Sequence, residues 1–229
     1  MAGLTIFVSC MDRRLNKYLE KEQDGRNLFV RNAGGNVLGL EQTLGFLIEN
    51  FNVTGIKVVA HTDCGAMGYV YNAVKKGENG IHKQLVEEFA NEKFADRLEL
   101  EKLNETIQKG LAQKLFGNKG ISISSELIAL NEPSENGKAH VAVVTKASVR
   151  KYSEIAKLMN LDEEDCYFLQ ANSITELLPD LALATGKLGI KDVRLAALDS
   201  TQYRQVNADF EMLKTRGFAD KAKITVVRL

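Results

Sequence analysis

The 229-residue sequence has only two prolines and three cysteines, and its formal net charge is zero. With two prolines there are few forced breaks, so we expect long, regular helices and strands. Three cysteines in a chain of this size do not indicate a disulfide framework. The cysteines are therefore better examined as metal ligands or as buried thiols.

Thirty acidic residues balance thirty basic ones, which argues against a general nucleic-acid or anionic-membrane partner. No apolar run approaches the roughly 18 residues that a membrane span requires. The first residues, MAGLTIFVSCMDRR, lack the basic start of a signal peptide, and their apolar run is better interpreted as a strand. We expect a cytoplasmic protein with no nucleic-acid or membrane partner.

The composition is that of an ordinary globular protein, with 45% hydrophobic and 26% charged residues. Short apolar segments alternate with segments of helical periodicity. The predicted strands are 4–9, 27–32 and 55–61, and the predicted helices are 14–22, 39–51 and 66–76. This alternation predicts an α/β fold with a largely parallel sheet flanked by helices.

Two further segments divide the chain. Residues 82–116 are highly charged, with leucines and phenylalanines at near-helical spacing, and they predict a helical insertion that packs on the periphery or on a partner. NEPSENGK, residues 131–138, has the composition of a linker. We predict a first domain over residues 1–130 and a second over 139–229.

The second domain resembles a repeat of the first. The pair KY at residue 17 recurs at 151, and GIK at residue 55 recurs at 189, so both are offset by 134 residues. LFVRNAG has a counterpart in YFLQANS, offset by a few more residues. Opposite Cys10, Asp12 and Arg14 the second copy has Val144, Lys146 and Ser148. Similarity between any two βαβ units is the alternative; the shared offset favours a degenerate duplication that has lost these residues.

Two motifs bring metal-binding residue types to strand ends. In VSCMDRRL, residues 8–15, Cys10 ends a predicted strand; in AHTDCGAMG, residues 60–68, His61 ends another and Cys64 follows it. The carboxyl ends of parallel neighbouring strands lie at one edge of the sheet. Two thiolates and an imidazole are a natural ligand set for Zn²⁺, whose catalytic sites leave a fourth position open. The sequence predicts one zinc per chain.

These motifs resemble those of the β-class carbonic anhydrases. CMDRR is similar to that family's C-x-D-x-R, FVRNAGG to its second-strand motif and HTDCGAM to its H-x-x-C-G motif, over roughly residues 4 to 75. The resemblance implies an α/β fold, zinc held by Cys10, His61 and Cys64, and an Asp12–Arg14 dyad. It also implies association into dimers or larger oligomers.

The implied activity is that of a lyase, a carbonate dehydratase that interconverts CO₂ and bicarbonate. Zinc lowers the pKa of bound water towards about 7, and the resulting hydroxide can attack CO₂. On the same extended segment, Arg14 can pair with Asp12, which then accepts a hydrogen bond from the hydroxide. Unpaired, Asp12 would become a fourth ligand and close the site. The alternative interpretation of these two residues is an ion pair at a strand end.

A second group of residues is expected to support the pocket and its loops: Asn32, Gly34, Gly35, Asp63 and Gly65. Gly34 and Gly35 would allow a tight turn and close approach of the backbone to the metal. Asp63 would tie down the loop between two ligands, unless it is simply a surface acid.

Two alternative functions remain open: a COS or CS₂ hydrolase on the same scaffold, and a catalytically silent zinc-binding regulatory protein. The family usually has N-terminal helices that embrace a partner subunit, whereas nine residues precede Cys10 here. We therefore hypothesise that residues 139–229 pack on the first half as a second subunit would, which makes an intrachain pseudo-dimer; a homo-oligomer is the alternative.

Overall fold

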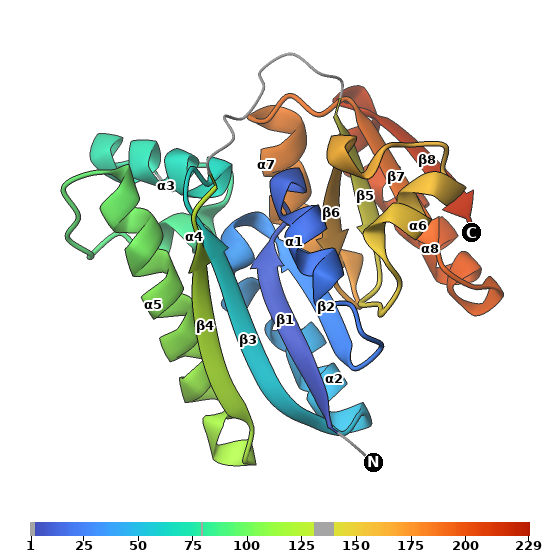
Figure 1. Cartoon of the computed structure of the whole chain (residues 1–229). Helices are drawn as coiled ribbons and strands as arrows, with labels where there is room; N and C mark the ends of the chain where they lie inside the picture. The colour runs from blue at the N-terminus through green and yellow to red at the C-terminus, as the bar shows by residue number, and fades with distance from the viewer. Residues whose placement is uncertain (1–2, 79, 131–139) are drawn as a thin grey trace.

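The computed structural model describes residues 3–78, 80–130 and 140–229, and their strands form one eight-stranded sheet (Figure 1). Its order is β4-β3-β1-β2-β6-β5-β7-β8. The strands are β1 (Leu4–Cys10), β2 (Asn27–Asn32), β3 (Val53–His61), β4 (Ser122–Ile128), β5 (Val141–Thr145), β6 (Cys166–Gln170), β7 (Asp192–Ala197) and β8 (Lys223–Arg228). The helices are α1 (Asn16–Lys21), α2 (Glu41–Asn50), α3 (Gly65–Lys76), α4 (Lys83–Glu87), α5 (Arg97–Phe116), α6 (Tyr152–Leu158), α7 (Leu178–Gly186) and α8 (Ser200–Thr215).

The predicted fold class is confirmed: neighbouring strands are parallel throughout, except that β2 pairs with β6 in antiparallel orientation. The central strands are apolar and buried, as expected for a sheet covered on both faces. The prediction missed β4, whose sequence SISSELI has no continuous apolar run. As an edge strand, β4 is partly exposed, so it could keep serines that a central strand would not.

The segment 82–116 is largely helical, as predicted, and it covers the side of the sheet that ends in the edge strand β4. It forms α4 and α5, and α5 packs against β3 and β4 (Figure 1). The helix buries Leu100, Ala112 and Phe116, and also the polar residues Glu101, Asn104 and Gln108. The charge of this segment belongs to the outer surface of the helix, while its inner surface contacts the loops at the sheet edge.

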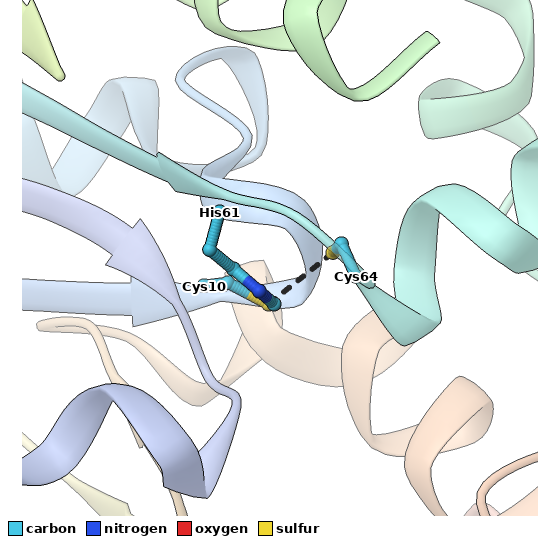
Figure 2. A group of neighbouring side chains, drawn as sticks. All are labelled: Cys10, His61 and Cys64. Atoms are coloured by element: carbon cyan, nitrogen blue, oxygen red, sulfur yellow. Dashed lines mark hydrogen bonds between the residues drawn. The ribbon is translucent and has the colours of Figure 1, made fainter. Parts of the chain in front are cut away.

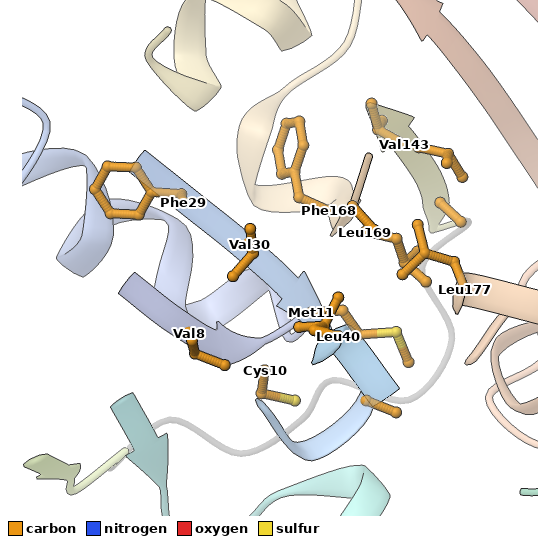
Figure 3. Close-up of a cluster of buried hydrophobic side chains, with 14 of the residues drawn as sticks. Val8, Cys10, Met11, Phe29, Val30, Leu40, Val143, Phe168, Leu169 and Leu177 are labelled. Carbon is orange, nitrogen blue, oxygen red and sulfur yellow. The ribbon is translucent and has the colours of Figure 1, made fainter. Parts of the chain in front are cut away.

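The sheet has a mirrored strand order about the β2–β6 junction. Reading outward from the junction gives β2, β1, β3 and β4 on one side and β6, β5, β7 and β8 on the other. Arg31 of β2 pairs with Gln170 of β6, and the two residues hold the same place in the matching segments LFVRNAG and YFLQANS. Side chains from both halves share one core, which includes Val30 and Leu169 (Figure 3). Across the halves, the ring of Phe29 packs edge-on against that of Tyr152, with the ring centroids 6.0 Å apart. The predicted linker lies outside the described residues, and the division into two domains stays a prediction.

Candidate metal centre

Two neighbouring strands deliver three buried side chains to one edge of the sheet. Strand β1 lies between β2 and β3 and ends at Cys10, while β3 ends at His61. Cys64 follows in the short loop before α3. The ligand atoms of the three residues lie within 4.8 Å of one another, and the two sulfur atoms are 3.8 Å apart (Figure 2). The sequence prediction that these residues meet is therefore matched by their geometry.

The three ligand atoms fit a zinc ion. In a tetrahedral site with Zn–S bonds of about 2.3 Å, two sulfurs lie about 3.8 Å apart. His61 Nδ1 is 2.9 Å from the carbonyl oxygen of Thr62, which can only accept, so Nδ1 carries the proton. Nε2 is buried and has no hydrogen-bond partner among the described residues. An imidazole nitrogen beside two thiols is one of the donor sets that catalytic zinc sites use.

The thiols and the imidazole influence one another strongly. The bond that Cys64 can donate, followed by the charge of His61, holds the pKa of Cys10 well below its usual value despite burial. Conversely, the bond to Cys10 and burial raise the pKa of Cys64 well above its usual value. Burial lowers the pKa of His61, but Cys10 and Asp12 outweigh it and raise that pKa overall. Without a metal, Cys64 therefore favours the protonated thiol, and zinc binding would displace that proton.

Asp12 and Arg14 form a buried ion pair beside this cluster. Arg14 Nε and Nη2 donate to Asp12 Oδ1 and Oδ2 at 3.0 and 2.7 Å, and Asp12 Oδ2 is 4.0 Å from His61 Nε2. Burial alone would raise the pKa of Asp12, but the Arg14 bonds and the His61 charge hold it below its usual value. The expected extended segment is wrong, because Arg14 lies in a 3₁₀ turn that Asp12 caps. The turn brings the guanidinium back to the carboxylate.

Arg31 fixes the backbone around these residues. Its side chain is fully buried, and it donates to the carbonyl oxygens of Cys10 and Asp12 at 3.0 and 2.8 Å and to the Asn16 side chain. The guanidinium also lies over the ring of Tyr152, from the second half, at 4.9 Å. The backbone from Cys10 to Asp12 is therefore held in place by one buried side chain.

The loop between His61 and Cys64 is held by acids and arginines. Asp63 accepts from Arg14 Nη1 at 2.8 Å and pairs with Arg97 Nη2 at 3.0 Å. The buried Glu101 carboxylate of α5 accepts from the backbone N–H groups of Asp63 and Cys64. Asp63 thus occupies the loop-tying position expected from the sequence, and it also contacts the arginine of the dyad.

The glycine pair after β2 has the conformation that the predicted turn needs. Gly34 and Gly35 have φ of 73° and 68°, and a Cβ on Gly35 would lie 3.3 Å from the Ser9 backbone. The Gly34 N–H points to Cys10 Sγ at 3.4 Å. Asn32 closes the same loop by bonding both backbone groups of Asn36. Gly65 begins α3, where a Cβ would make ordinary contact at 3.5 Å, so nothing at this position demands glycine.

Sequence reasoning missed four residues that hold these loops: Glu101, Asn104, Gln108 and Asp180. Asn104 donates to the Gly34 carbonyl, and Gln108 accepts from Val37 N–H. Asp180, from α7 of the second half, accepts from Ala33 N–H. On α5 the signal was available, because Glu101, Asn104 and Gln108 share one helix face. For Asp180 no local pattern exists.

A cavity of about 390 Å³ adjoins the dyad. Its lining is rich in cations and contains the arginine that pairs with Asp12: Arg13, Arg14, Asn16, Lys17, Ala129, Leu130 and Glu164. Lys17 forms an ion pair with Glu164, and Arg13 donates to its backbone carbonyl.

The family model for carbonic anhydrase matches residues 5–149, more than half of the chain. The chain belongs to the β-carbonic anhydrase family. Membership makes this protein a carbonic anhydrase-like lyase and agrees with the Cys10, His61 and Cys64 cluster. The family model reaches past the motifs on which the sequence resemblance was based.

Comparison with curated proteins gives no match. Among solved structures, a carbonic anhydrase from Glaciozyma antarctica is 22% identical, covering 55% of this chain and 75% of that one, with a TM-score of 0.38. Two tetrameric β-carbonic anhydrases from Sordaria macrospora give a match of 14% identity, covering 56% and 77%, with a TM-score of 0.41. The β-carbonic anhydrase CcaA is 17% identical, covering 56% and 69%, with a TM-score of 0.40.

Within the described residues, no helix is both long enough and apolar enough to cross a membrane.

Proposed function

We propose that this β-carbonic anhydrase catalyses the reversible hydration of CO₂ to bicarbonate, with one zinc ion per chain held by Cys10, His61 and Cys64. The supporting observation is the buried cluster itself, in which two thiols and an unpartnered imidazole nitrogen converge. A zinc ion there would lower the pKa of a water molecule towards about 7 and so supply hydroxide at neutral pH.

The chain's own residues would orient and gate this chemistry. Because the pKa of Asp12 is depressed, its carboxylate is anionic at neutral pH and can accept a hydrogen bond from the attacking hydroxide. Arg14 holds that carboxylate through two bonds. If Arg14 released it, Asp12 would be free to turn to the cluster as a fourth ligand and close the site. We therefore assign the catalytic role to Asp12 and the gating role to its pairing with Arg14.

We further propose that residues 139–229 are a degenerate second copy that packs as a partner subunit would. The mirrored strand order and the pairing of Arg31 with its aligned counterpart Gln170 support this proposal. So does Asp180, through which the second half contacts the loop after β2. In the second copy, the position of Cys10 is occupied by Val144, which is buried among apolar residues, so we assign no metal to that half.

Stopped-flow CO₂ hydration by zinc-loaded protein tests the proposed activity, with Cys64→Ala as the control. We expect a zinc-dependent rate at pH 8 to 9 that the variant loses. Hydrolysis of COS or CS₂ without CO₂ hydration would instead assign the substrate to that related class. Zinc binding without turnover of any of the three substrates would identify a regulatory zinc protein.

A further inference from the structure

The guanidinium of Arg14 is shared between two carboxylates. Nε and Nη2 donate to Asp12, while Nη1 donates to the Asp63 side chain and Nη2 also donates to the Asp63 carbonyl oxygen, both at 2.8 Å. All three guanidinium nitrogens are therefore engaged. The Asp12–Arg14 dyad is the inner part of a larger arrangement in which Asp63 binds the opposite side of the guanidinium.

This arrangement is a chain of alternating charges that reaches α5. Asp63 also pairs with Arg97 at 3.0 Å, and Arg97 pairs with the buried Glu101 at 3.0 Å. Both ends of this chain of charges are buried and its middle is exposed: the side chains of Asp12 and Glu101 are 8% and 3% exposed, whereas that of Asp63 is 41% exposed. Asp63 therefore connects the buried dyad to solvent and to the helix behind it.

The backbone at Asp63 is in an unusual conformation. Its φ is +53°, a left-handed value that non-glycine residues rarely adopt and that costs of order 1 kcal/mol or more. In this conformation its N–H reaches Glu101 while its carboxylate lies between two arginines. The surrounding bonds offset the strain, and the result is a carboxylate aimed at Arg14.

A second Asp-x-Arg pair in the chain shows what Asp63 adds. Asp24 accepts from the backbone and side chain of Arg26 with the same spacing as Asp12 and Arg14, but both side chains are largely exposed. The local spacing alone thus produces an ion pair, and exposed pairs of this kind contribute little. Arg14 differs because a second acid, from a distant loop, holds its other side.

We propose that Asp63 is a positioning residue that holds Arg14 against Asp12 and so keeps the Asp12 carboxylate turned away from the metal cluster. The proposal rests on the proposed zinc centre and its gating dyad. Asp63 would set the balance between the open site, in which Asp12 stays on Arg14, and the closed site, in which Asp12 joins the cluster. Without Asp63, Arg14 gains rotational freedom and Asp12 loses its fixed partner.

The first test uses the metal-free, full-length protein labelled with ¹⁵N, in which arginine Nε–H signals report how firmly each side chain is held. In Asp63→Asn we expect the Arg14 Nε–H to exchange with water at least about tenfold faster, as loss of a charge-assisted bond implies. Arg31, bonded to the Cys10 carbonyl, serves as the buried control and should not change. An unchanged Arg14 signal would overturn the proposal. Asp63→Gly is the second variant, since glycine adopts positive φ without strain.

The second test measures zinc affinity by competition with a chelator at pH 7. We expect Asp63→Asn to bind zinc more tightly than wild type, because the freed Asp12 adds a ligand, and we expect this gain to vanish when Asp12→Asn is also present. A gain that persists without the Asp12 carboxylate would contradict the proposal. Both readouts are independent of turnover, so a protein that failed to hydrate CO₂ would refute the proposed function and leave this test decisive.

Discussion

Asp180 of α7 accepts a hydrogen bond from the backbone N–H of Ala33 at 2.8 Å, although the two residues belong to different halves of the chain. The same oxygen is 3.2 Å from Nε2 of the buried His82. Since His82 Nδ1 accepts from Leu85 N–H, Nε2 carries the proton and donates to Asp180. A single carboxylate from the second half thus fixes the turn at Ala33, and the next residue, Gly34, points its N–H to Cys10 of the candidate metal cluster.

Replacing Asp180 with alanine should weaken both folding and zinc binding. Two buried donors would lose their acceptor, which costs about 2–4 kcal/mol of unfolding free energy, and the loop against Cys10 would loosen. Asp180→Asn should be milder, because an amide oxygen can replace Oδ1 and Oδ2 has no partner among the described residues. Urea denaturation of metal-free protein and chelator competition measure the two effects.

Glu176→Ala is the matched control for this prediction. Glu176 also joins the halves, accepting from the backbone and hydroxyl of Thr43, which lies in α2 and not in the glycine turn at Ala33–Gly35. This variant should lose stability and keep its zinc affinity. Equal zinc affinities in the Asp180→Ala and Glu176→Ala proteins would show that Asp180 does not support the metal site.

Metal analysis should find one zinc per chain in wild type. His61→Ala and Cys64→Ala should lose it, whereas Cys166→Ala should retain it because that thiol lies away from the cluster. Free zinc at 100 times its dissociation constant should raise the unfolding free energy by about 2.7 kcal/mol, measured as a shift of the urea midpoint. Two zinc ions per chain would contradict the prediction that the second half binds none.

Asp12→Asn should lower kcat/KM for CO₂ hydration by about 10²-fold or more while zinc stays bound, because a neutral amide does not replace an anionic acceptor at the reacting centre. Stopped-flow assays combined with metal analysis of the same samples measure this change. Asp24→Asn, in the exposed pair of the same spacing, is the control and should have wild-type activity. Full activity of Asp12→Asn would show that Asp12 and Arg14 form only an ion pair at a strand end, with no catalytic role.

We expect the buried thiol of Cys166 to make the unfolding free energy depend on pH in the alkaline range. Burial, followed by the charge of Asp165, raises the pKa of this thiol to about 12 from the model-peptide value of 9.0. The folded state therefore favours the protonated thiol, and the stability that this contributes is complete below pH 9 and declines as pH rises from 9 towards 12.

Comparison with Cys166→Ala isolates this effect, because all other titrating groups are shared. At pH 8 the variant should be less stable than wild type, since it leaves a small cavity in β6. Between pH 9 and 10 that difference should shrink by about 1 kcal/mol, as measured by urea denaturation. A difference that does not vary with pH would mean that the thiol titrates normally in the folded protein.

Local sequence patterns were enough to predict several strands, one turn and the meeting of Cys10 with His61. The apolar segments at 4–9, 27–32 and 55–61 each form a strand, because β-branched residues in short runs favour a buried parallel sheet. Cys10 and His61 could be placed at one sheet edge because parallel neighbours end together. The glycines after β2 could be assigned to a turn because only glycine adopts positive φ freely.

Tertiary structure decided what holds that site together. Three contacts join residues far apart in the chain. Glu101 on the inner face of α5 binds the Cys64 loop, Asp180 binds Ala33 across the β2–β6 junction, and Asp63 binds Arg14. No sequence periodicity predicts such pairings. A charged residue is predicted to lie at the surface unless its buried partner is known, and that partner is distant in the sequence. The sequence thus placed the candidate metal ligands through local strand ends and turns, and only the packing of distant elements decided how those residues are held.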